Sequence, residues 1–233
     1  MTFVADTGTA TPASNLTLRV LSALVLAPIA LAAAYFGGWP FALFWGAAAL
    51  AVLWEWLKLV RGPVWLAAGF VYAGILFAAP VILRGDAELG LAAILLLFAI
   101  VWATDILGYF AGRAFGGPKL MPAVSPKKTW SGAVAGTFGS ALIAVAIAVY
   151  SGWFQSGTFI AVALLLSLVA QVGDLLESWI KRKFGAKDAS QLIPGHGGVM
   201  DRLDGFWAAA LLGCLIGLAR GGFDAPARGL LLW

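Results

Sequence analysis

The chain has 233 residues, of which 62% are hydrophobic and 11% are charged. A soluble domain carries roughly 25% charged residues, so this composition excludes a soluble globular enzyme, a disordered chain and a collagen-like chain. The single cysteine, Cys214, excludes an intrachain disulfide, and in a membrane protein the net charge of +4 indicates basic cytoplasmic loops rather than nucleic-acid binding.

Apolar segments long enough to cross a bilayer follow one another along the chain. A spanning helix needs about 20 mostly apolar residues, and Ser151–Gly157 divides a long uncharged stretch into two such segments. In chain order the predicted spans are Val20–Phe36, Phe41–Leu57, Val64–Leu83, Leu89–Gly108, Ser131–Tyr150, Thr158–Leu176 and Gly205–Ala219. The sequence therefore predicts an all-α polytopic membrane protein with about seven transmembrane helices, forming a single membrane-embedded domain over residues 1–233.

The basic residues predict the orientation of these spans. With a cytoplasmic N-terminus, the opposite side of the membrane holds only Arg84, Arg220 and Arg228 of the 15 lysines and arginines. This distribution follows the positive-inside rule. We therefore expect the N-terminus and both long polar segments, 109–130 and 177–204, to lie on the cytoplasmic side.

The first polar cluster, residues 105–130, begins inside the fourth predicted span. Asp105 lies within the apolar segment, where an unpaired carboxylate is costly, so we expect it either to have a function or to pair with Arg113. Further along, Ser125-Pro126-Lys127-Lys128-Thr129 places hydroxyls and two ammonium groups just before the next helix. Because helix N-termini also attract anions, this segment favours binding of anionic oxygens.

The second polar cluster, residues 174–204, carries two pairs of carboxylates. Asp174 and Glu177 are three residues apart and share a helix face, and Asp201 and Asp204 repeat this spacing at the start of the last span. Carboxylates on two helix ends at the same membrane face are suited to divalent cations. Magnesium fits best, since it takes one or two carboxylates and leaves other positions to water and phosphate oxygens.

The segment between these pairs supplies the opposite charge. Lys181, Arg182 and Lys187 are candidate phosphate ligands. The following Pro194–Gly198, with sequence Pro-Gly-His-Gly-Gly, allows the backbone to approach a ligand closely, although it lacks the spacing of a Walker loop.

These residues carry a resemblance to a known family. The segment Ser178–Asp204 resembles the signature of phosphatidate cytidylyltransferases, also called CDP-diacylglycerol synthases. The matching positions are Ser178, Lys181-Arg182, Lys187-Asp188, Pro194, His196-Gly197-Gly198, Asp201-Arg202 and Asp204. Asp105–Arg113 and Ser125–Thr129 also resemble the family, so the likeness covers roughly the C-terminal half of the chain.

The resemblance implies a metal-dependent transfer from CTP to phosphatidate that yields CDP-diacylglycerol and pyrophosphate. It implies magnesium, with more than one cation, as cofactor, and it implies an integral protein of the inner membrane whose active site faces the cytoplasm. The implied metal ligands are Asp174 and Asp201, supported by Glu177 and by Asp204. The implied catalytic residues are Asp174, Asp201, Asp204, Lys181 and Arg202. The implied substrate-binding residues are Asp105, Ser125, Lys127, Lys128, Thr129, Arg182, Lys187, Asp188, His196 and Gly197. Which basic residues contact CTP and which contact the lipid phosphate stays open.

Simpler interpretations exist for several of these residues. Lys183 is best explained as a positive-inside anchor below its helix. Asp188 has about equal claims to a catalytic role and to fixing the loop through Lys187. The role of His196 is nucleotide contact or acid–base chemistry. The abundant small residues allow close helix packing and leave a homodimer open.

Three other functions share features with cytidylyl transfer. A CDP-alcohol phosphotransferase shares the Asp201–Gly205 opening, but it requires Ala-Arg next and then two further aspartates on the following helix, which this chain lacks. An ion-coupled transporter predicts charges near the midplane and two matching halves, whereas here the charges gather at one face. A CTP-dependent lipid kinase is the nearer alternative, because it uses similar nucleotide chemistry.

Overall fold

The computed structural model describes residues 12–193 and 197–233, with side chains described from residue 21 onward except residue 23. The helices are α1 (Pro12–Phe36), α2 (Gly38–Leu59), α3 (Pro63–Arg84), α4 (Gly90–Phe115), α5 (Trp130–Tyr150), α6 (Thr158–Lys183), α7 (Met200–Gly221) and α8 (Pro226–Leu231). The strands are β1 (Lys119–Met121) and β2 (Ser125–Thr129). The predicted all-α class is confirmed, with this strand pair as a small addition.

Helices α2 to α7 are each long and apolar enough to cross a membrane, which makes the protein an integral membrane protein. The described apolar part of α1, Leu24–Phe36, is shorter than a span. The count of seven spans and the cytoplasmic N-terminus therefore stay predictions.

Helices α1 to α7 all begin or end beyond the apolar segments that predicted them, and the extensions of α4, α6 and α7 reach the polar clusters. Helix α4 continues past Gly108 to Phe115, α6 continues past Leu176 to Lys183, and α7 begins at Met200 rather than Gly205. Hydropathy marks the part of a helix that faces lipid tails, whereas backbone hydrogen bonding continues into the polar interface. Consequently all the carboxylates of the second polar cluster near α6 and α7 lie on regular helix, except Asp188 in the intervening loop.

The segment between α4 and α5 forms an antiparallel hairpin. Lys119 pairs with Thr129 and Met121 with Ser125, and β2 leads directly into α5. The Thr129 hydroxyl caps α5 by accepting a hydrogen bond from the Gly132 backbone N–H at 3.2 Å. The hairpin and the cap together hold the two lysines of Ser125–Thr129 on extended backbone beside the start of a helix.

Glycines let the helices that carry the carboxylates approach closely. A Cβ at Gly132 of α5 would lie 2.5 Å from the Gly108 carbonyl oxygen of α4, and one at Gly136 would lie 2.6 Å from the Thr104 oxygen. A Cβ at Gly173 of α6 would lie 2.6 Å from the Ala208 Cβ of α7. Small residues at such contacts bring backbones together in membrane bundles, so α4, α5, α6 and α7 meet side by side.

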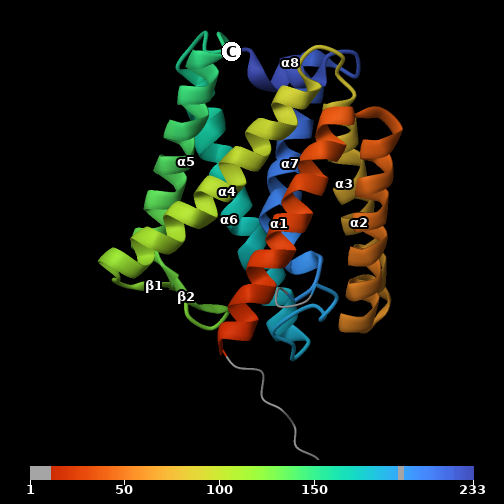
Figure 1. Cartoon of the computed structure of the whole chain (residues 1–233), viewed down its shortest axis with the longest axis vertical. Helices are drawn as coiled ribbons and strands as arrows, with labels where there is room; N and C mark the ends of the chain where they lie inside the picture. The colour runs from red at the N-terminus through yellow and green to blue at the C-terminus, as the bar shows by residue number, and fades with distance from the viewer. Residues whose placement is uncertain (1–11, 194–196) are drawn as a thin grey trace, which may run out of the picture.

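The two polar clusters lie at the same end of the bundle, as predicted (Figure 1). The start of α1, the β1–β2 hairpin and the described part of the loop between α6 and α7 (residues 184–193 and 197–199, called here the α6–α7 loop) gather at that end, whereas α8 lies at the other. The bundle therefore has one polar end and one end closed by a short helix.

Asp86 attaches α8 to the rest of the bundle. Its Oδ2 accepts hydrogen bonds from the backbone N–H groups of Ala227 and Arg228, both at 3.1 Å, and its Oδ1 accepts from Glu88 and Leu89 at 3.0 and 2.9 Å. Burial raises the pKa of Asp86, but these backbone donors outweigh it, so the pKa lies below its ordinary value.

This pKa predicts how stability depends on pH at the closed end. The folded state holds the Asp86 proton less tightly than the unfolded chain does, so the stabilisation is fully present above about pH 4 and is lost as the pH falls through the folded-state pKa. We expect Asp86→Asn to lower the free energy of unfolding by roughly 1–3 kcal/mol at pH 7, with a smaller difference below pH 4.

Thermal unfolding in detergent across this pH range measures the effect. Asp224→Asn is the matched control, since Asp224 is an exposed aspartate at the same end of the bundle. A difference between Asp86→Asn and wild type that stays constant from pH 7 to pH 3 would contradict this account.

Candidate active site

Lys181 joins α6 to α7 through two carboxylates. Its Nζ donates to Glu177 Oε1 at 2.9 Å and to Asp201 Oδ1 at 2.5 Å. The three side chains are 8%, 1% and 6% exposed, so the ion pairs are buried. Glu177 Oε2 is buried and has no hydrogen-bond partner among the described residues. This group of three therefore carries one more negative charge than positive.

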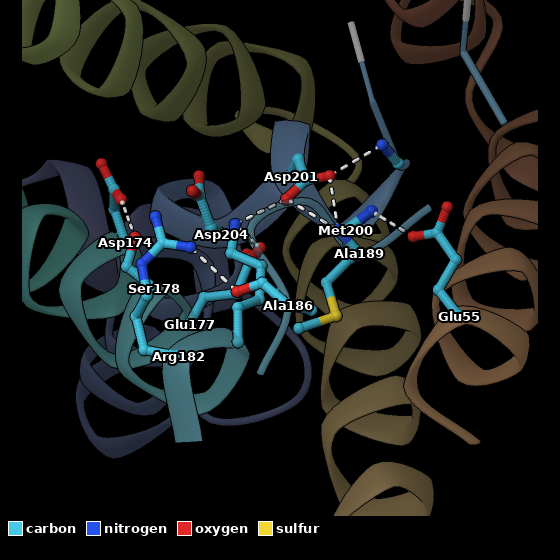
Figure 2. A network of polar contacts seen from close by, with 12 residues as sticks. Glu55, Asp174, Glu177, Ser178, Arg182, Ala186, Ala189, Met200, Asp201 and Asp204 are labelled. Carbon is cyan, nitrogen blue, oxygen red and sulfur yellow. Dashed lines mark hydrogen bonds and ion pairs between the residues drawn. The ribbon is translucent and has the colours of Figure 1, made fainter. Parts of the chain in front are cut away.

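Asp201 also closes the α6–α7 loop (Figure 2). Its Oδ2 accepts hydrogen bonds from the backbone N–H groups of Ala189 at 3.0 Å and Gly198 at 2.7 Å. Gly197 adopts a φ of +85°, and a Cβ there would lie 2.9 Å from Asp201 Oδ2. The loop can therefore fold onto this carboxylate only because glycine stands at that position.

A second ion pair brings the two polar clusters together. Lys128 Nζ on β2 donates to Asp174 Oδ2 on α6, and Ser178 Oγ donates to the other oxygen of Asp174 at 3.4 Å. Arg182 strengthens this contact, since its Nε donates to the Val124 carbonyl at 3.4 Å and its Nη1 to the Ala186 carbonyl at 2.8 Å. Residues far apart in sequence thus form one site at the polar end.

Carboxylates outnumber the cations around them. We call Asp105, Asp174, Glu177, Asp201 and Asp204 the acidic cluster, because each interacts electrostatically with others of the set across α4, α6 and α7. Among the described residues, three cationic side chains interact with these five carboxylates: Lys128, Lys181 and Arg202. The carboxylates therefore outnumber the cations that interact with them by two groups.

Two members of the acidic cluster keep lone pairs that the described protein does not use. Asp105 has no hydrogen bond or ion pair among the described residues, and Asp204 accepts one bond, from the Gly205 backbone N–H at 2.7 Å. The alternative pairing of Asp105 with Arg113 is wrong, because Arg113 Nη1 donates to the Tyr109 hydroxyl at 3.3 Å instead. A functional role of Asp105 stays a prediction.

A cavity of about 400 Å³ opens beside Asp105. Helix α4, the β1–β2 hairpin and α5 form most of its wall, with one residue from α6. The polar side chains that line it are Thr104, Asp105, Tyr109, Arg113, Lys119, Lys127, Lys128, Thr129 and Gln171. Four of these side chains, from α4 and the hairpin, are cationic, which suits an anionic ligand.

The structure places the other predicted site residues around this cavity and the α6–α7 loop. Ser125 begins β2, and Arg202 is exposed beside Asp105. Lys187 and Asp188 are exposed on the loop, and no ion pair fixes either among the described residues. His196 lies outside the described residues.

The donors fit a hydrated divalent cation better than a cation enclosed by protein ligands. No three histidine, cysteine, aspartate or glutamate side chains converge on one point in the described part of the chain. However, the surplus of carboxylates, the unpartnered Glu177 Oε2 and the free lone pairs of Asp105 and Asp204 match an ion that keeps several waters and phosphate oxygens.

Sequence reasoning missed Glu55. This α2 side chain is 0% exposed and accepts hydrogen bonds from Ser190 Oγ at 2.6 Å, Val199 N at 2.9 Å and Met200 N at 2.8 Å. A signal was present, because Glu55 is the one acidic residue in the predicted span Phe41–Leu57. A charge inside such a segment indicates a function by default.

Gln171 was missed as well. It lies within the uncharged stretch before Asp174, and its Nε2 donates to Thr137 Oγ1 at 2.7 Å and to the Ala133 carbonyl at 3.3 Å. Its signal was weaker, because an uncharged amide does not stand out from a hydropathy profile.

Comparison with known proteins finds a matching family and several similar sequences. The model of the cytidylyltransferase family matches residues 61–217. A phosphatidate cytidylyltransferase of Brucella suis biovar 1 (strain 1330) is 41% identical in an alignment 267 residues long, which covers 92% of this chain and 97% of that protein. A phosphatidate cytidylyltransferase of Rickettsia bellii (strain RML369-C) is 35% identical over 199 residues, covering 82% of this chain and 86% of that protein.

The buried ion pairs of Lys181 make a testable prediction about stability. Lys181→Ala leaves two buried carboxylates without their cation, so we expect it to lower the free energy of unfolding by about 3–5 kcal/mol. Lys183→Ala is the matched control: Lys183 is exposed and its Nζ lies 4.7 Å from the Trp65 ring centroid, a contact worth about 1 kcal/mol or less. Thermal unfolding in detergent compares the two, and equal losses in both variants would contradict the prediction.

Proposed function

The chain belongs to the cytidylyltransferase family, and on that premise we propose that it transfers the cytidylyl group of CTP to phosphatidate, forming CDP-diacylglycerol and pyrophosphate. The observation that carries the proposal is the contact between a cavity with four basic side chains and an acidic cluster with excess negative charge. The basic wall suits the phosphates of two anionic substrates, and the carboxylates suit the cations that accompany them. The names of the relatives supply the identity of those substrates.

The proposed reaction needs little covalent help from the protein. An oxygen of the phosphatidate phosphate attacks the α-phosphorus of CTP, the bond between the α- and β-phosphates breaks, and pyrophosphate leaves with the bonding electrons. Since the attacking oxygen is already an anion, no general base is needed. The rate then depends on alignment of the two substrates and on compensation of their charge.

The side chains at the cavity supply part of that compensation. Lys127 and Lys128 present ammonium groups beside the N-terminus of α5, where the helix dipole also favours anions. Arg202 at the start of α7 adds a cation close to Asp105. These groups align the phosphates and reduce the repulsion between the two anionic substrates.

The cofactor in this proposal is magnesium, held by carboxylates of the acidic cluster. Asp174, Glu177 and Asp201 are the ligands expected from the sequence, and the free lone pairs of Asp105 and Asp204 make these two further candidates. Asp201 already accepts hydrogen bonds from Lys181 and from two backbone N–H groups, so we assign it chiefly to holding the α6–α7 loop. When bound, magnesium supplies charge neutralisation at the phosphate oxygens.

The proposed location is the inner membrane, with the polar end of the bundle facing the cytoplasm. The concentration of lysines and arginines at that end supports this orientation through the positive-inside rule. The homodimer that the small residues left open stays a prediction.

The position of the label on CTP separates this function from its nearest rival. Purified protein in detergent, given magnesium and phosphatidate, should move label from the α-phosphate of CTP into lipid and leave γ-label in pyrophosphate. A CTP-dependent lipid kinase would instead move the γ-label into lipid. Absence of α-label in lipid from well-folded protein would contradict the proposal.

One variant pair ties the activity to the acidic cluster. We expect Asp204→Asn to lower the rate at least roughly 100-fold, because it removes charge that holds the cation beside the reacting phosphates. The control Asp224→Asn changes an exposed aspartate at the opposite end and should keep full activity.

A further inference from the structure

Glu55 lies outside the acidic cluster, yet it contacts the same loop from the opposite side (Figure 2). It belongs to the last turns of α2 and is fully buried. Its Oε1 accepts hydrogen bonds from Ser190 Oγ and the Val199 N–H, and its Oε2 accepts from the Met200 N–H. Its partners lie 135 to 145 residues further along the chain, so Glu55 connects the N-terminal helices to the signature segment.

Backbone groups, rather than a basic side chain, compensate the charge of Glu55. Among the described residues no lysine or arginine forms an ion pair with it. Val199 and Met200 are the N-cap and first residue of α7, so the carboxylate accepts N–H groups that the helix itself leaves free. The positive end of the α7 dipole stabilises the charge further. The Glu55 carboxylate therefore accepts the free backbone N–H groups at the start of α7 and holds these residues in place.

Gly198 makes this contact possible. A Cβ at Gly198 would lie 2.7 Å from Glu55 Oε1 and 2.8 Å from Oε2, closer than a side chain can come. The N–H of the same glycine donates to Asp201 Oδ2 at 2.7 Å. Residues 198–200 are thus held between two carboxylates, Asp201 on the side of the acidic cluster and Glu55 on the side of α2.

We infer that Glu55 is a positioning residue of the proposed active site. By fixing Ser190 and the first residues of α7, it sets the position of Asp201 and Asp204 relative to the carboxylates of α6. It acts through the loop and α7 and touches no reacting atom. This inference rests on the proposed cytidylyl transfer for its effect on rate, whereas the contacts that it assigns to Glu55 are testable without turnover.

The substitutions follow from the chemistry of the carboxylate. Glu55→Gln keeps the shape but offers one acceptor oxygen and turns an amide N–H toward a backbone N–H. Ser190→Ala removes one of the three hydrogen bonds and leaves the buried carboxylate in place, so it keeps the test valid if Glu55 variants fold poorly. Glu88→Gln is the matched control, because Glu88 is an exposed glutamate at the far end of the bundle.

Two measurements on the full-length protein in detergent test the inference. Hydrogen exchange of the Val199 and Met200 amides should become at least roughly tenfold faster in Glu55→Gln. The reason is that a neutral side-chain amide with one acceptor oxygen replaces the charged carboxylate that accepts both N–H groups. At a temperature well below unfolding, kcat should fall roughly tenfold or more, with KM for CTP changing much less. Ser190→Ala should lower kcat less, and its effect should be smaller still in a Glu55→Ala background, where it removes only the hydrogen bond that Ser190 Oγ accepts from the Leu192 N–H at 3.0 Å.

The outcomes separate a positioning role from a structural one. A purely structural role predicts a lower melting temperature with wild-type kcat in the folded variant, and that result would overturn the inference. Unchanged exchange at Val199 and Met200 would overturn it as well. Failure of the wild-type protein to transfer α-label to lipid would contradict the proposed function alone, since the exchange experiment does not depend on activity.

Discussion

A surplus of carboxylates over cations at one end of an apolar bundle is the constraint on which the rest of this structure depends. Charges at membrane depth are costly unless other groups compensate them. Lys181 compensates Glu177 and Asp201, and Lys128 compensates Asp174. Among the described residues, the five carboxylates nevertheless outnumber the three cations that interact with them. The proposed function assigns a ligand that brings positive charge to these carboxylates and a ligand that brings negative charge to the basic cavity next to them.

The fold maintains this arrangement through close backbone contacts and a tightly held loop. Gly132 and Gly173 let α4, α5, α6 and α7 approach until their carboxylates interact. Asp201 and Glu55 then hold the end of the α6–α7 loop from opposite sides. Preorganised groups of this kind cost no reorganisation when the reaction begins, which is how a site with little covalent chemistry accelerates phosphoryl-type transfers.

The sequence was sufficient for features that depend on local spacing. The separation of Asp174 from Glu177 and of Asp201 from Asp204 places each pair on one helix face, and α6 and α7 do extend over both pairs. Contacts between distant segments were beyond such reasoning. Lys128 meets Asp174 across 46 residues and Glu55 meets Met200 across 145, and hydropathy classed Glu55 simply as part of a span. The hairpin was also missed, because three- and five-residue strands leave almost no periodic pattern.

Binding of a divalent cation in the absence of turnover tests the central claim most directly. Manganese is a paramagnetic substitute for magnesium, and its spectrum reports free and bound ion during a titration of the purified protein. The excess negative charge predicts saturable binding that magnesium displaces, weakened roughly tenfold or more when Asp105 and Asp204 are both changed to asparagine. Binding that never saturates, or an affinity that is the same in the doubly substituted protein, would contradict the account.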